Sequence, residues 1–77
     1  MAKKNIIRGR FVKFDVTGLR VNESLTEALN ILDGECRYGS GGTWDIHRFG
    51  QKIVATPVDG PFDTLYFNRS KGSWGVL

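Results

Sequence analysis

The chain has few of the residues from which catalytic and metal sites are built. Its 77 residues include one cysteine, Cys36, and one histidine, His47. A single cysteine excludes a disulfide within the chain. One cysteine and one histidine also fall short of the three or four such ligands that a zinc site needs. We therefore expect no metal and no cofactor.

Long apolar runs are missing as well. No stretch approaches the roughly 20 apolar residues of a membrane-spanning helix. The opening residues Met1-Ala2-Lys3-Lys4 do not lead into the apolar core of a signal peptide. The sequence therefore predicts a cytoplasmic protein with no membrane partner.

No arrangement of the remaining polar residues indicates catalysis. Cys36 and His47 lie on either side of a glycine-rich segment, and nothing in their spacing brings them within hydrogen-bonding reach. That segment, residues 39–42, also lacks the Lys-Ser/Thr pair and the following helix of a phosphate-binding loop. A packed cysteine, a surface histidine and a plain linker are the simpler interpretations. We expect a protein that is not an enzyme.

Composition indicates one small folded domain covering residues 1–77. The chain is 40% hydrophobic and 25% charged, which is typical of a globular protein rather than a disordered one. Ten glycines suit a β protein that is rich in turns. Residues 1–5 are expected to form a flexible basic arm, and residues 39–42 a flexible glycine-rich loop.

Charge is unevenly distributed along the chain. Residues 1–20 hold six bases and one acid, residues 21–35 hold four acids and no base, and residues 36–77 hold five bases and three acids. The segment charges of +5, −4 and +2 add to the net +3. An acidic helix beside basic strands would favour an anionic partner on the sheet side. A surface charge that only maintains solubility is the alternative.

The strongest local signal is a helix over residues 24–34, SLTEALNILDG. Ser24 and Glu27 fit the capping-box pattern S-x-x-E, and Gly34 fits a left-handed C-cap. Apolar residues recur at helical spacing on one side, at Leu25, Ala28, Leu29 and Leu32. A helix this short is marginal in water, so its apolar stripe must pack against a sheet.

The remaining segments predict strands. Residues 6–16 are rich in β-branched and aromatic side chains. Residues 44–57 read as a hairpin around the Gly50-Gln51 turn, with Phe49 opposite Lys52. Residues 63–68 and 73–77 read as a second hairpin, with Phe67 opposite Trp74 and the Tyr66 ring over Gly75. The expected fold is α+β, with one short helix on one face of a mostly antiparallel sheet of about five strands (β-α-β-β-β-β). A small, half-open barrel with a plugging helix is the alternative.

The face of the sheet that the helix leaves uncovered is the candidate binding surface. Aromatic rings interleaved with bases can stack unpaired nucleotides and neutralise phosphates. The predicted registers place aromatic, basic and other residues there: Phe11, Lys13, His47, Phe49, Lys52, Val54 and Tyr66. Arg69 and Lys71 on the last loop, and Lys3 and Lys4 on the arm, would add backbone contacts.

The same face also suits a protein partner, because aromatic residues and arginine dominate protein interfaces. It would equally suit a homodimer stacked sheet to sheet, or it is the ordinary surface of a small protein. The pattern of a strand, an ESLTEALNIL helix and further strands is similar to many small α+β proteins of phages and mobile elements. Several of those act by binding and blocking a host protein. The sequence thus predicts a non-enzymatic module that binds single-stranded or structured nucleic acid, with a protein-binding inhibitor or adaptor as the alternative.

Overall fold

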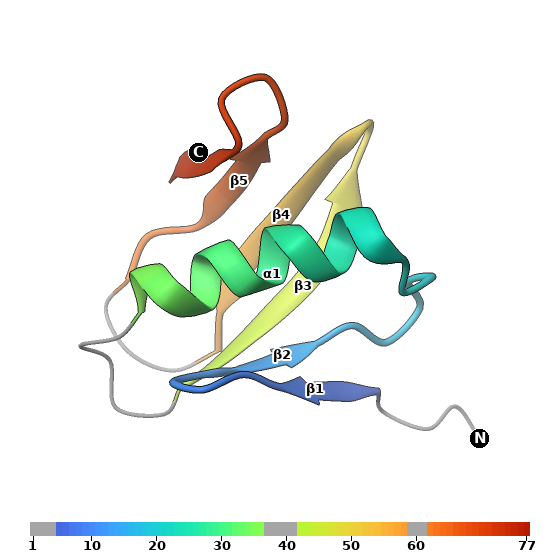
Figure 1. The fold of residues 1–77 in the computed structure, drawn as a ribbon, viewed down its shortest axis with the longest axis vertical. Coiled ribbons are helices and arrows are strands. Elements are labelled where there is room, and N and C mark those ends of the chain that lie inside the picture. The colour runs from blue at the N-terminus through green and yellow to red at the C-terminus, as the bar shows by residue number, and fades with distance from the viewer. Residues whose placement is uncertain (1–4, 37–41, 59–61) are drawn as a thin grey trace.

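A computed structural model of the chain describes residues 5–36, 42–58 and 62–77. One helix, α1 (Glu23–Glu35), crosses one face of a six-stranded sheet (Figure 1). The strands are β1 (Ile6–Arg8), β2 (Lys13–Asp15), β3 (Thr43–Phe49), β4 (Lys52–Pro57), β5 (Leu65–Asn68) and β6 (Ser73–Val76). Their order in the sheet follows their order in the sequence, and β2–β3 is the parallel pair among antiparallel neighbours. The predicted α+β class is confirmed.

The N-terminal residues form two strands rather than one. The expected single strand over residues 6–16 is wrong, because the chain reverses after Gly9, whose N–H donates to the carbonyl of Val12 at 2.8 Å. This turn pairs β1 with β2 in the register Ile7 opposite Phe14 and Arg8 opposite Lys13. The sheet therefore has six strands instead of the five expected.

Helix α1 begins earlier than its sequence pattern indicates. Asn22 is the N-cap, with an extended backbone and a side-chain oxygen that accepts from the Leu25 N–H at 2.9 Å. The predicted Ser24–Glu27 capping box is therefore wrong, and Ser24 lies inside the first turn. Asparagine caps helices as well as serine does. This start places Glu23 in the first turn, where its carboxylate interacts favourably with the positive end of the helix dipole.

The predicted C-cap is also wrong, because Gly34 lies within the last helical turn. Cys36 occupies the C-cap position, and its N–H donates to the carbonyls of Leu32 and Asp33. Asp33 helps to fix the position of the C-terminal end of α1. Its carboxylate is buried and accepts from the backbone N–H groups of Arg10, Phe11 and Val12 in the β1–β2 turn.

Both predicted hairpins are confirmed. β3 and β4 pair with Phe49 opposite Lys52 and Ile46 opposite Ala55. Gly50 has a φ of 64°, as a left-handed first turn position requires. β5 and β6 pair with Phe67 opposite Trp74.

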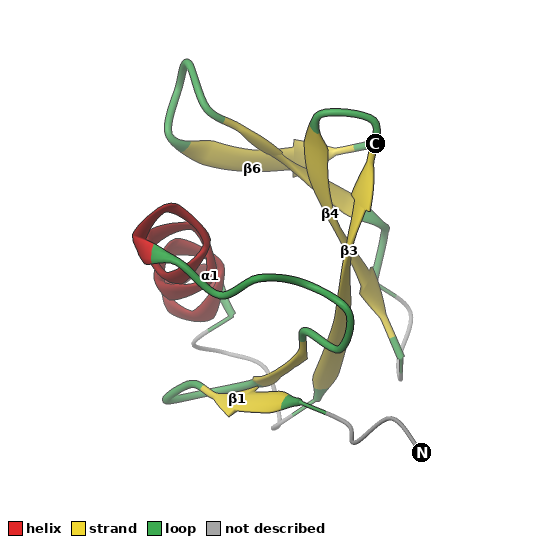
Figure 2. Cartoon of the chain, turned by 90° about the vertical axis from the view of Figure 1, so that its right-hand side faces the viewer, coloured by secondary structure: helices red, strands yellow, loops and turns green. Residues whose placement is uncertain are grey.

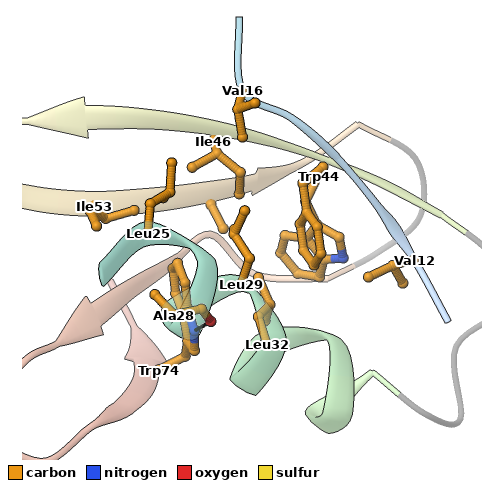
Figure 3. Packing of buried hydrophobic residues seen from close by; sticks show 12 residues of the cluster. Val12, Val16, Leu25, Ala28, Leu29, Leu32, Trp44, Ile46, Ile53 and Trp74 are labelled. Carbon is orange, nitrogen blue, oxygen red and sulfur yellow. Dashed lines mark hydrogen bonds between the residues drawn. The ribbon is translucent and has the colours of Figure 1, made fainter. Parts of the chain in front are cut away.

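The core lies between α1 and the concave face of the sheet (Figure 3). The predicted helical stripe supplies one side of it, and the sheet supplies the other with Val12, Phe14, Val16, Trp44, Ile46, Ile53, Ala55 and Trp74. Leu65 and Phe67 pack against this cluster. The Trp74 indole N–H donates to the carbonyl of Ala28 at 2.7 Å, which ties β6 to the middle of the helix.

The sheet curves around the helix but stays open (Figure 2). β1 and β6 are the two ends of the strand order, so the barrel alternative is wrong. The expected arm over residues 1–5 and loop over residues 39–42 lie mostly outside the described residues. Asn5 and Gly42 are described, and both bond to neighbours: Asn5 accepts from the Val16 N–H and Gly42 from the Lys13 N–H.

Candidate binding face

The open face is the surface of the sheet opposite α1 (Figure 2). We define it by side-chain alternation from the strand registers. Its members are Ile6, Arg8, Lys13, Asp15, Thr43, Asp45, His47, Phe49, Lys52, Val54, Thr56, Tyr66, Asn68, Ser73 and Gly75. Five of the eight predicted binding residues are on this face: Lys13, His47, Phe49, Lys52 and Tyr66.

The centre of the open face is a row of directly opposite residues that crosses four strands. His47 on β3 is opposite Val54 on β4, Val54 is opposite Tyr66 on β5, and Tyr66 is opposite Gly75 on β6. Val54 is only 2% exposed, although α1 lies on the other side of the sheet. Val54 is therefore covered on the open face, where His47 and Tyr66 are its directly opposite neighbours, and this part of the face is a packed layer.

The Tyr66 ring has two contacts within the sheet. A Cβ built on Gly75 would lie 3.4 Å from the Tyr66 ring, so the ring rests on the bare backbone as predicted. The Lys52 ammonium lies 4.9 Å from the centre of the same ring, within the range of a cation–π interaction. Tyr66 is therefore already packed against Gly75 and in contact with Lys52, so it is less available for stacking than an exposed ring.

Phe49 is the exposed aromatic residue of the open face. It lies at the end of β3, next to the Gly50 turn, and 73% of its surface is accessible. Burying a phenylalanine side chain is worth about 1.5–3 kcal/mol. Most of the Phe49 side chain gains no such burial energy within the described chain. Phe49 is therefore the residue of the face that would gain the most free energy from burial against a partner.

Phe11 is not on the open face, which corrects the prediction. It lies in the β1–β2 turn and packs against the core cluster. Its backbone N–H donates to Asp33 Oδ1 at 2.9 Å. The prediction failed because it read residues 6–16 as one continuous strand, whereas the turn ends the alternation before Phe11.

One of the two bases of the last loop lies away from the open face. Arg69 lines a groove on the helix side with Glu27, Ile31 and Phe67, so its predicted place beside the open face is wrong. Lys71 is exposed in the same loop, where its backbone N–H donates to the Asn68 side chain at 3.2 Å.

Sequence reasoning missed the opposite end of the face. Arg8 and Lys13 are opposite each other on β1 and β2, and both line a hollow of about 420 Å³ with Ile6, Asp15, Thr43 and Val58. The isolated Gly9 within the strand pattern is the available signal, since such a glycine indicates a break in a regular strand, and a reversal there places Arg8 beside Lys13.

The open face carries charges of both signs. Arg8, Lys13 and Lys52 are its bases, while Asp15 and Asp45 are opposite each other on the parallel pair β2–β3. Three bases and two acids leave a net charge of +1. The face is therefore less basic than the segment charges indicate, and bases such as Arg69 contribute to the helix side instead.

Cys36 and His47 lie on opposite sides of the sheet. Cys36 packs against the core cluster at the end of α1, whereas His47 belongs to the open face. Burial raises the pKa of the Cys36 thiol, and the nearby carboxylates of Asp33 and Glu35 raise it further. A thiol of this kind holds its proton at neutral pH, which disfavours nucleophilic chemistry.

Two further searches of the described residues bear on partners. No group of three or more His, Cys, Asp or Glu side chains within residues 5–36, 42–58 and 62–77 is arranged to hold a metal ion. The helix in this part of the chain is too short and too polar to cross a membrane.

Comparison with known proteins gives no further assignment. No protein-family model, no curated protein and no solved structure matches the chain.

Proposed function

We propose that the chain is a non-enzymatic binding module that contacts a partner protein through its open face, acting as an inhibitor or an adaptor. The observation that carries this proposal is Phe49, a large aromatic side chain exposed at 73% beside a packed layer of His47, Val54 and Tyr66. An exposed aromatic anchor on a firm, mixed-charge surface is typical of the residues that dominate protein interfaces.

The state of the other aromatic residues supports a protein partner over a nucleic acid. Nucleotide stacking was predicted from Phe11, Phe49 and Tyr66 together. Phe11 packs against the core cluster, and the Tyr66 ring contacts the backbone of Gly75 and the Lys52 ammonium. Among the described residues of the open face, Phe49 is the one aromatic residue that is exposed, whereas single-strand binding surfaces stack successive bases on several rings.

Nucleic acid remains the second candidate because of one specific feature. Arg8 and Lys13 lie side by side at one end of the open face, and the whole chain carries +3. Two adjacent bases can neutralise phosphates. The opposed carboxylates of Asp15 and Asp45 weaken this second proposal, because they repel a phosphate backbone that runs along the face.

The first experiment compares capture of proteins from a nuclease-treated lysate by the wild-type chain and by Phe49→Asp. Removing an interface hot spot costs about 2 kcal/mol or more, so we expect at least a 30-fold loss of affinity for the captured protein. Ile31→Asp is the control, because Ile31 is also exposed but lies on the helix side of the sheet, in the groove that Phe67 and Arg69 line.

The second experiment separates the two candidates directly. Labelled single-stranded DNA and RNA are titrated with the chain at low and moderate salt. Binding at tens of micromolar that weakens steeply with salt would favour nucleic acid, since counterion release makes phosphate contacts strongest at low salt. A protein retained after nuclease, together with no nucleic-acid binding at low salt, would favour the first proposal.

A further inference from the structure

The two edge strands of the sheet differ in their contact with α1. β6 lies close to α1 (Figure 2), and the Trp74 indole N–H bonds to the carbonyl of Ala28. Covering an edge strand with a helix is one of the ways in which proteins protect it from pairing with another chain. β1 is the other end of the strand order, and no described helix or strand lies beyond it (Figure 1).

The hydrogen bonds of β1 show which of its groups face outward. Val16 donates to the carbonyl of Asn5, and Gly9 donates to the carbonyl of Val12. Bonded and non-bonded residue pairs alternate along an antiparallel ladder. Asn5, Ile7 and Gly9 therefore bond toward β2, whereas the N–H and C=O groups of Ile6 and Arg8 point away from the sheet.

This outward edge is accessible. Ile6 is 40% exposed, and Arg8 is exposed as well. Two donors and two acceptors at regular spacing match the backbone of an extended peptide, which adds to a sheet edge by strand addition. The edge thus offers main-chain hydrogen bonds to any strand of suitable side-chain chemistry.

The side chains beside this edge select that chemistry. Arg8 and Lys13 form a non-hydrogen-bonded pair, in which opposite side chains are closer than in a bonded pair. Within the described part of the chain neither makes an ion pair, and like charges directly opposite each other are unfavourable. A carboxylate from an added strand would relieve this repulsion.

The residues that line the hollow next to β1 indicate which side chains an added strand would carry. Ile6 and Val58 give it apolar walls, and Thr43 adds a hydroxyl. Asp15 is the acid among the described residues of the hollow. It is opposite Ile6 and accepts from the Thr17 N–H and hydroxyl. An acidic side chain therefore fits opposite Arg8, and an apolar one fits opposite Ile6, which is two residues away on the same face.

We propose that the free edge of β1 binds an extended acidic segment of the partner protein by strand addition, with an acid opposite Arg8 and an apolar residue opposite Ile6. This inference rests on the proposed function, since it takes the partner to be a protein. A second copy of the chain fits less well, because pairing two β1 strands would bring two Arg8–Lys13 pairs together.

The test uses a blocked pentapeptide, acetyl-Val-Thr-Glu-Thr-Val-amide. Its glutamate has a valine two residues before it and another two residues after it, so the pattern of acid and apolar residue is the same in either strand direction. The full chain is labelled with nitrogen-15 and titrated with this probe. We expect the amide signals of Ile6 and Arg8 to shift and their hydrogen exchange to slow several-fold, while the amide of Ile7, which already bonds to β2, keeps its exchange rate.

The glutamine version of the probe measures the acidic preference. We expect it to bind about threefold more weakly, the size of an exposed ion pair, and Arg8→Gln should remove the difference. Lys71→Gln is the matched control and should preserve it. Equal binding of the two probes to the wild-type chain, or unchanged Ile6 and Arg8 amides, would overturn the proposal.

A backbone variant separates this inference from the proposed function. Ile6→Pro removes an outward N–H without touching the bonds to β2, and proline is tolerated at such edge positions. Ile6→Pro should not bind the probe, whereas Ile6→Ala should keep the main-chain bonds and bind it with an affinity within a few-fold of wild type.

Protein capture distinguishes a failure of this inference from a failure of the proposed function. If the wild-type chain captures no protein, the proposed function fails. If it captures one that Arg8→Gln and Ile6→Pro both retain, only the β1 inference fails.

Discussion

The carboxylate of Asp33 accepts a 2.9 Å hydrogen bond from the backbone N–H of Phe11, a residue 22 positions earlier in the chain. Arg10 and Val12 donate to the same carboxylate at 2.8 and 3.1 Å. The side chain thus does for the β1–β2 turn what an N-cap does for a helix, since it satisfies N–H groups that have no strand partner. It also fixes the last turn of α1 against the first hairpin.

The first prediction concerns the loss of this carboxylate. Asp33→Asn keeps the shape of the side chain, but its NH₂ group then faces backbone donors that need an acceptor. We expect the free energy of unfolding to fall by about 1–3 kcal/mol, the cost of leaving a buried donor unsatisfied. Urea unfolding at pH 7 measures the change, and a loss below 0.5 kcal/mol would show that water replaces the carboxylate.

Asp33 also gives the fold a defined response to acid. Burial works to raise the pKa of Asp33, but the hydrogen bonds from Phe11, Arg10 and Val12 outweigh it, and the pKa lies below 3.8. A carboxyl group with a lower pKa in the folded state adds stability that is present above the unfolded pKa and lost as pH falls through the folded value. We expect the wild-type chain to lose stability below pH 3.8 more steeply than Asp33→Asn. Parallel curves for the two proteins would contradict this.

A second prediction uses two glycines with opposite surroundings. A Cβ built on Gly9 would lie 2.6 Å from Asp33 Cγ and 2.9 Å from the carbonyl oxygen of Val12, whereas one on Gly34 would meet no atom within 4 Å. Gly9→Ala should therefore destabilise the protein by about 1–3 kcal/mol, as overpacking does. Gly34→Ala should stabilise it by about 0.5–1 kcal/mol, because alanine is the better helix former. Thermal unfolding of the pair checks both signs.

Local patterns were enough to predict the hairpins and the core. The two-residue spacing around Gly50 and the alternation of residues 44–57 determine the β3–β4 register, because a shift by one residue would turn Ile46 away from the helix. The leucine stripe of α1 likewise has one apolar side, and that side is the one buried.

Features that depend on tertiary contacts were not predictable in this way. The end of the helix is one of them, because Gly34 satisfies a local capping rule, yet Asp33 holds this end through its bonds to residues 10–12. The start of the helix is a different case, since the Asn22 cap is itself a local pattern that competes with Ser24. The open face was missed in part for the same reason. One unrecognised turn at Gly9 moves Phe11 into the core and brings Arg8 next to Lys13.

A third prediction tests the bond between β6 and the helix. Trp74→Phe keeps a large aromatic ring but removes the indole N–H that bonds to Ala28. We expect a loss of about 1 kcal/mol for the hydrogen bond, plus a further loss for the smaller ring. Hydrogen exchange should show faster opening of β6, while β3 and β4 stay protected. Equal acceleration in all strands would mean that the bond stabilises the whole fold rather than this edge.

The last prediction separates a structural aromatic residue from a binding one on the same face. Tyr66→Ala removes the ring that rests on Gly75 and that Lys52 contacts, so we expect a loss of about 1–3 kcal/mol in stability, less than for a fully buried aromatic residue because Tyr66 is half-buried. Phe49→Ala removes a ring that is exposed at 73%, and its free energy of unfolding should change by less than 0.5 kcal/mol.

Partner capture should distinguish the two variants in the opposite way. Phe49→Ala should stay folded and lose affinity for the partner. Any loss of binding in Tyr66→Ala should follow from its unfolding and should be recovered at lower temperature. If Phe49→Ala binds as well as wild type at equal folded fraction, the open face acts through another residue, and the β1 edge becomes the first surface to test.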